Sequence, residues 1–196
     1  ILSSLKKRFG KNFHIHIYLS TLLVDENKIK TLSKFVDEVR FHPVFKNNIR
    51  EEIKKIAIAK KYFDKKNIGI EIPIFPDKKN QTIKLIERAI PYIGFLNLNE
   101  LEIGESNMAW IEKNYSLNED TYTIKNSLKV GKEILKKFEK EIDVHLCTAK
   151  TKNWYQYRNR LKNYPEKKFF KKTDEGTQIY SSKKEEKIKK ILKENE

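Results

Sequence analysis

Apolar and polar residues alternate along five short stretches of this chain. Side chains on a β-strand point to opposite faces in turn, so an alternation of period two predicts a strand with one apolar and one polar face. The five predicted strands are Asn12–Leu19, Val36–His42, Ile68–Ile74, Gly94–Glu100 and Ile142–Cys147.

The stretches between these strands carry apolar residues at spacings of three and four, which is typical of amphipathic helices. The clearest is Asn48–Phe63, where Asn47 or Asn48 can cap the first turn. Other helices are predicted at Ile1–Phe9, Asp25–Phe35, Asn80–Ile93, Asn107–Lys113, Ser127–Lys140 and Trp154–Tyr164. A regular alternation of strand and helix predicts parallel strands joined by crossover helices.

The polar phase of the predicted strands holds histidines, carboxylates, an arginine and amides, for example Arg40, Glu71 and Asn97. A parallel sheet covered by helices on both faces reads as near-continuous apolar runs, and these strands do not. We therefore predict an α/β fold, a partial (β/α) barrel with a polar interior, over residues 1–164. Residues 165–196 are predicted to form a basic C-terminal extension with a hairpin around Asp174-Glu175-Gly176 and a terminal helix at Lys183–Glu196.

The chain is strongly basic, with 42 lysines and arginines against 27 aspartates and glutamates. Two explanations remain open: a composition rich in both lysine and glutamate, or a functional basic surface for an anionic partner such as nucleic acid. Near the C-terminus, aromatic residues such as Trp154 and Tyr157 alternate with arginines such as Arg158. This pattern fits either stacking on nucleic-acid bases or packing of the aromatics on the barrel.

Cysteine content and hydropathy indicate the cellular setting. Cys147 is the single cysteine among the 196 residues, so no disulfide can form within the chain and a cytoplasmic location is expected. No apolar run approaches the roughly 18 residues that a membrane-spanning helix needs, so no membrane partner is expected. Because the chain begins with Ile1 rather than methionine, we expect a segment of a longer product.

Sites in parallel α/β sheets and barrels form at the carboxyl ends of the strands and in the loops that follow. There, arginine presents a fixed fork of donors to an anion, histidine titrates near neutral pH, and asparagine offers a donor and an acceptor. The candidate binding residues are Thr21, His16, Arg40, His42, Glu71, Asn97, Asn99, Glu100 and His145. No residue is assigned a catalytic role.

A structural role, rather than ligand binding, can also explain the presence of some of these residues. Arg40 can form an ion pair with Glu38 or Glu71, and cysteine is more often a small buried residue than a nucleophile. His14 and His16 can both face a metal, but neither their spacing nor a nearby cysteine or carboxylate matches a standard zinc pattern, so no metal site is predicted.

Five pieces of the sequence carry a resemblance to a known family: FHIHIYLSTLL, VDEVRFHP, IGIEIPIFPD, FLNLNELEIGESN and DVHLCTAK. Together they resemble the later part of the barrel of radical S-adenosylmethionine enzymes, and in particular archaeal proteins related to the pyruvate formate-lyase activating enzyme. The resemblance covers roughly residues 1–160 and implies S-adenosylmethionine and a four-iron four-sulfur cluster as cofactors of the full-length parent.

The family's three-cysteine loop, which binds the cluster, and its glycine-rich motif are not in this sequence. The resemblance therefore implies a chain that starts before the family's third strand and lacks the cluster-binding part. By strand position, Thr21, Arg40 and His42 would lie near the ribose or methionine end of the cofactor, and Glu71 near the cofactor itself. The residues implied near adenine or substrate are Asn97, Asn99 and Glu100.

Three hypotheses follow for function. In the first, the chain is the C-terminal part of a radical S-adenosylmethionine enzyme that acts on a small molecule or a protein; its partner is the missing N-terminal part of the barrel or an equivalent subunit, and alone it has no radical activity. In the second, the basic C-terminal segment binds nucleic acid, with affinity that falls steeply with salt. In the third, the chain is a complete small α/β enzyme that uses Arg40, His42 and Glu71 in acid–base catalysis.

Overall fold

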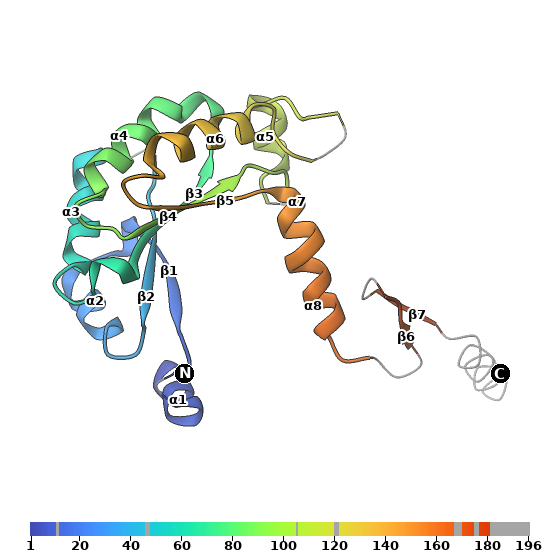
Figure 1. Ribbon diagram of the computed structural model, residues 1–196, viewed down its shortest axis with the longest axis horizontal. Coiled ribbons are helices and arrows are strands. Elements are labelled where there is room, and N and C mark those ends of the chain that lie inside the picture. The colour runs from blue at the N-terminus through green and yellow to red at the C-terminus, as the bar shows by residue number, and fades with distance from the viewer. Residues whose placement is uncertain are drawn as a thin grey trace. The chain divides into compact units, whose positions relative to one another are not determined.

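The computed structural model describes residues 1–10, 12–45, 48–104, 106–119, 122–166, 170–174 and 177–180 (Figure 1). The chain divides into two compact units, Ile1–Thr148 and Ala149–Glu196, and each is described by itself.

The first unit is built on a five-stranded sheet in which every strand is parallel to its neighbours. The sheet order follows the chain order, β1-β2-β3-β4-β5. The strands are β1 (His16–Ser20), β2 (Glu38–His42), β3 (Ile68–Ile74), β4 (Phe95–Glu100) and β5 (Asp143–Cys147). The predicted α/β fold with parallel strands and crossover helices is confirmed, and the sheet is consistent with a partial (β/α) barrel.

The crossover helices lie along one face of this sheet (Figure 1). The α-helices of the unit are α1 (Leu2–Phe9), α2 (Glu26–Leu32), α3 (Ile49–Ala59), α4 (Lys79–Ala89), α5 (Met108–Asn114) and α6 (Ser127–Phe138). Short 3-10 turns occupy Thr21–Leu23, Lys65–Asn67 and Pro76–Lys78. Asn48 caps α3 as predicted, since its side chain accepts a hydrogen bond from the Arg50 amide at 2.9 Å. Helix α4 ends at Ala89, four residues before the predicted end, because Pro91 lacks the N–H that a further turn needs.

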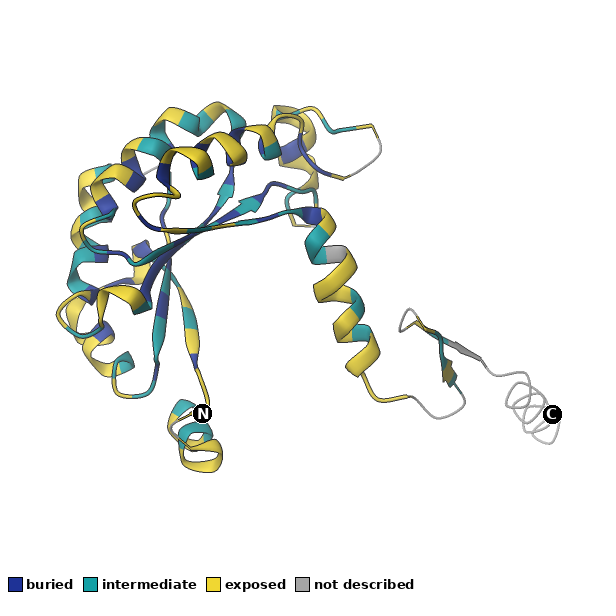
Figure 2. Ribbon diagram, viewed as in Figure 1, coloured by how far each residue is buried: buried dark blue, intermediate teal, exposed yellow. Residues whose placement is uncertain are grey.

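The alternation along the strands separates two faces of the sheet. Phe41, Ile70 and Leu96 have no exposed surface and pack in the main core beneath the helices. Their neighbours Arg40 and Glu71 are on the opposite phase of the strands and are only partly buried. Buried and intermediate positions alternate along the strands (Figure 2). The β-strand period thus sends apolar side chains to the helices and leaves the other face to polar side chains.

The second unit begins with a continuous helical stretch that changes hydrogen-bond pattern along its length. Helix α7 (Ala149–Thr151) leads into a π-helical segment, Lys152–Tyr157, and then into α8 (Arg158–Asn163). An antiparallel hairpin follows, formed by β6 (Phe170–Lys172) and β7 (Gln178–Tyr180), at the place where a hairpin was expected. The expected terminal helix at Lys183–Glu196 lies outside the described residues. In the part of the chain that the structure describes, no helix has both the length and the apolar character for a membrane span.

Candidate functional site

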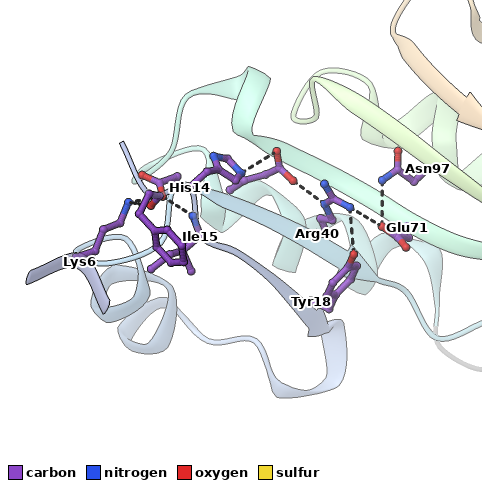
Figure 3. Close-up of polar contacts among 10 residues, drawn as sticks. Lys6, His14, Ile15, Tyr18, Arg40, Glu71 and Asn97 are labelled. Carbon is purple, nitrogen blue, oxygen red and sulfur yellow. Dashed lines mark hydrogen bonds and ion pairs between the residues drawn. The ribbon is translucent and has the colours of Figure 1, made fainter. Parts of the chain in front are cut away.

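Six polar side chains from four neighbouring strands form one connected network on the face of the sheet opposite the helices. Figure 3 shows Tyr18, Arg40, Glu71 and Asn97 of this network. We call it the polar network. Its members are Tyr18, Glu38, Arg40, Glu71, Asn97 and Asn99. Parallel pairing places these residues side by side, because Tyr18 is in register with Arg40 and Glu71 with Asn97. Four predicted site residues, Arg40, Glu71, Asn97 and Asn99, are thereby brought together in one network.

Glu71 is the common acceptor of the network. Its Oε2 accepts hydrogen bonds from Arg40 Nη1 at 3.2 Å and Asn97 Nδ2 at 3.0 Å, and its Oε1 accepts one from Asn99 Nδ2 at 3.2 Å. The side chain is 20% exposed, so three donors compensate a carboxylate that is largely removed from water.

Arg40 is held by charge and by aromatic rings. Its Nε donates to Glu38 Oε1 at 2.6 Å, and its guanidinium carbon lies 5.5 Å from the centroid of the Tyr18 ring and 5.6 Å from that of Phe95. Burial alone would lower the pKa of Arg40, but the hydrogen bond and charge of Glu38, with smaller contributions from Tyr18 and Glu71, raise it. Arg40 is therefore a permanent, fixed cation.

Phe95 can lie against Arg40 because the neighbouring residue on β3 is a glycine. A Cβ on Gly69 would come within 2.1 Å of the Phe95 ring. The ring occupies the space that any larger side chain at position 69 would fill.

The three histidines predicted for the site lie at the margins of this network. His42 is exposed at the end of β2, and its Nδ1 lies 3.0 Å from the Glu71 carbonyl oxygen. His145 is exposed on β5, in register with Asn97. His16 is exposed at the start of β1, in register with Glu38.

Two predicted site residues, Thr21 and Glu100, are not members of the polar network. Thr21, just after β1, is fully buried, and its Oγ1 has no hydrogen-bond partner among the residues that the structure describes. Glu100 is in register with Ile74, so the two-residue period places it on the phase of Leu98 rather than that of Asn97. It is 6% exposed at the end of β4.

A hollow of about 560 Å³ lies beside the loops that follow β3 and β4. Trp110 and Tyr115 form part of its wall, packed edge to face, and Lys78 and Lys125 also line it. The Tyr115 hydroxyl donates to Asp77 Oδ1 at 2.6 Å, and burial together with this bond raises the pKa of Tyr115. This hollow was not among the predicted sites; the aromatic residues after the fourth strand, Trp110 and Tyr115, were the signal in the sequence that pointed to it.

The polar network suits a polar or cationic small molecule. It contains two carboxylates and one guanidinium, so one negative charge is in excess, while the amides of Asn97 and Asn99 can bind hydroxyl or ring-nitrogen groups. Cys147 ends β5 and is buried, with a 6% exposed fraction. A single cysteine cannot supply the three or four thiolates that an iron–sulfur cluster usually takes.

Fold and site together define an α/β protein with a five-stranded parallel sheet, consistent with a partial (β/α) barrel, and a polar network on the face opposite the helices. The chain is 33% identical over 172 residues, which are 83% of its length, to a protein of Methanocaldococcus jannaschii named "Putative glycyl-radical enzyme activating enzyme MJ0021". The chain spans 45% of the length of that relative. No family model matches the chain, and no solved structure matches it.

Proposed function

We propose that this chain supplies the cofactor- and substrate-binding strands of a radical S-adenosylmethionine enzyme that activates a glycyl-radical enzyme, in the branch related to the pyruvate formate-lyase activating enzyme. The observation that carries the proposal is the similarity to an activating enzyme along 83% of the chain. The substrate is accordingly a protein. The rest of the barrel, including the cluster-binding cysteines, lies in a preceding segment or a separate subunit.

The residues present fit S-adenosylmethionine but not the cluster. The polar network has an excess negative charge that suits a sulfonium and an ammonium group, and the buried Thr21 Oγ1 is a hydroxyl without a partner among the described residues. One buried cysteine cannot hold the cluster, so no step of the chemistry is assigned to a cluster on this chain.

When bound in a complete enzyme, S-adenosylmethionine is the source of the radical that takes a hydrogen atom from the substrate protein. The task of this chain is to position it. Glu71, fixed by three donors, offers the acceptor for hydroxyl groups of the ribose. Asn97 and Asn99 hold Glu71 in place and present their remaining amide atoms to the ligand.

The test starts from the DNA upstream of the Ile1 codon and from the adjacent genes, which we expect to encode a three-cysteine loop. The protein, expressed with that part and reconstituted anaerobically with iron and sulfide, is incubated with S-adenosylmethionine and a reductant. We expect 5′-deoxyadenosine to form, and Glu71→Ala to lower the rate about tenfold or more. Glu87→Ala, which removes an exposed ion pair with Lys137, is the matched control. The absence of a three-cysteine loop from both places contradicts the proposal.

A second candidate function, nucleic-acid binding, is favoured by the exposed aromatics of the second unit. Trp154 is 53% exposed and Tyr155 69%, and the Arg158 guanidinium carbon lies 3.7 Å from the centroid of the Trp154 ring. Aromatic rings beside cations can stack on single-stranded bases.

Filter binding of a single-stranded oligonucleotide at two salt concentrations tests this second function. We expect affinity that falls steeply with salt and a loss of about fivefold for Trp154→Ala. Trp110→Ala, which removes a similarly exposed indole from the first unit, should leave the affinity unchanged. Weak binding that does not respond to salt would exclude nucleic-acid binding as the function of the second unit.

A further inference from the structure

Two histidines and a carboxylate converge at the start of the first strand, at the opposite end of the sheet from Thr21 and His42. One ligand atom from each of His14, His16 and Glu38 can be chosen so that all three lie within 4.8 Å of one another. We propose that these three side chains form a binding site for a divalent first-row transition-metal cation, such as zinc or cobalt. The site shares Glu38 with the polar network but uses its other carboxylate oxygen, Oε2, and the inference does not depend on the proposed function.

Strand geometry brings the three groups together. His14 lies two residues ahead of His16, the first residue of β1; both side chains are exposed while Ile15 between them is buried, and the two ring centroids are 6.0 Å apart. Glu38 is the register partner of His16 on β2, so its carboxylate rises beside the same face. Figure 3 shows His14 at this end of the sheet, and its Nε2 is the ring atom that faces Glu38 Oε2.

The distances need only a small adjustment to reach coordination. Ligand atoms bound tetrahedrally at 2.0–2.2 Å from zinc are about 3.3 Å apart. His14 Nε2 already lies 3.7 Å from Glu38 Oε2. Because the His14 side chain is 53% exposed, rotation about its side-chain bonds can close the remaining gap without disturbing the core.

A supporting contact orients the carboxylate. Arg40 Nε binds Glu38 Oε1, which leaves Oε2 directed toward His14. Hydrogen bonds of this kind to ligating carboxylates fix their orientation and increase metal affinity. The ammonium of Lys6, which lies in the same region, is engaged by Asp37 and by the Phe13 carbonyl and does not enter the site.

The donor set decides the class of metal. Two imidazoles and one carboxylate suit zinc, cobalt, nickel or copper, whereas magnesium and calcium prefer sites made of oxygen ligands alone. Three protein ligands leave a fourth position for water or another small ligand.

The test is metal titration of the chain prepared without a polyhistidine tag, followed by calorimetry for Zn²⁺ and by visible absorption for Co²⁺. We expect one Zn²⁺ per chain and a Co²⁺ spectrum without a thiolate charge-transfer band. Glu38→Gln should weaken binding about tenfold or more, and magnesium should not compete.

The chain contains four histidines, which allows a control matched in histidine number. His14→Ala/His16→Ala and His42→Ala/His145→Ala each leave two histidines. Loss of binding only in the first double variant supports the site. Equal loss in both, no loss in the first, or no binding by the parent chain overturns it. Circular dichroism checks that each variant is folded. If the first double variant is unfolded, metal binding by the single variants His14→Ala and His145→Ala is compared instead, and loss only in His14→Ala supports the site.

Discussion

At the scale of single residues, Glu71 is the position on which the polar network depends. Its carboxylate accepts hydrogen bonds from Arg40, Asn97 and Asn99, each on a neighbouring strand. In a Glu71→Gln variant an amide NH₂ would face donors where an oxygen now accepts. Because a partly buried guanidinium would lose a charged partner, we expect the free energy of unfolding in urea to fall by about 1–3 kcal/mol.

The matched control for Glu71 is Glu87, whose Oε1 lies 3.1 Å from Lys137 Nζ on the helical surface. Both side chains of that pair are nearly half exposed, so Glu87→Gln should change the free energy of unfolding by less than about 1 kcal/mol. Equal effects of the two substitutions would mean that the network contributes no more than a surface ion pair.

Thr21 is expected to separate stability from ligand binding. A buried hydroxyl without a partner is costly, so in Thr21→Val a similar volume replaces a polar group that makes no bond among the described residues. We expect the free energy of unfolding to stay level or to rise by about 1 kcal/mol, while cofactor binding by the complete enzyme weakens.

Ser127 provides the contrast to Thr21. It is equally buried, but its Oγ accepts the Leu101 N–H at 2.8 Å and donates to the Ile74 carbonyl at 2.9 Å. Ser127→Ala should therefore lower the free energy of unfolding by about 1–3 kcal/mol. Thermal unfolding of both variants checks the pair of predictions, and a Thr21→Val variant that loses as much stability as Ser127→Ala would show that the hydroxyl is bonded.

At the scale of elements, Asp37 joins helix α1 to the first two strands. It precedes β2, accepts the Ile15 N–H at 2.7 Å, and pairs with Lys6 from α1. Burial works to raise the pKa of Asp37, but the hydrogen bonds from Lys6 and from the Ile15 N–H lower it overall. The carboxylate form is thus favoured by folding.

This shift predicts a pH dependence of stability. A carboxyl whose pKa is lower in the folded state stabilises above its unfolded pKa of about 3.9 and loses that contribution as the pH falls through the folded value. Asp37→Asn should therefore lower the free energy of unfolding by about 1 kcal/mol at pH 7 and by much less near pH 3. Melting curves at both values test this, with the exposed Asp143→Asn as control. A difference that does not depend on pH would argue against the ion pair.

Element types could be predicted from the sequence because each depends on a local period. The third strand, Ile68–Ile74, has the same bounds in sequence and structure. The first strand begins at His16, four residues later than predicted, because the ladder starts at the His16–Glu38 pair and Asp37 binds the Ile15 N–H ahead of it. The residue at which a strand begins depends on its pairing with a neighbouring strand, and a local sequence pattern does not contain that pairing.

The same limit applies to the site. Alternation predicted which residues share a face, and Arg40, Glu71 and Asn97 do meet there. The convergence of His14 and His16 on Glu38 depends on the register between β1 and β2, and the sequence alone therefore indicated no carboxylate beside the histidines. Side chains on the same face of a sheet form a shared site only where the register between the strands also brings them side by side.

At the scale of the whole molecule, the first unit contains its own core. The main buried cluster runs from Ile15 to Ile142, and a second cluster is built on Leu101, Ile111 and Ile124. Every buried residue of both clusters lies within Ile1–Thr148. Since burial of apolar surface is the dominant stabilising contribution, this unit has what it needs to fold by itself.

We therefore predict that a chain ending after Thr151 keeps the parallel sheet and unfolds cooperatively, with a free energy of unfolding within about 1 kcal/mol of the full chain. The two tryptophans make the comparison direct, since the cut removes Trp154 and leaves Trp110 as the fluorescent probe beside Tyr115. Full-length Trp154→Phe is the matched reference, because it also reports on Trp110 alone. Urea unfolding of the two proteins should give the same midpoint, and a shortened chain that aggregates or melts without cooperativity would show that the second unit is needed to complete the fold.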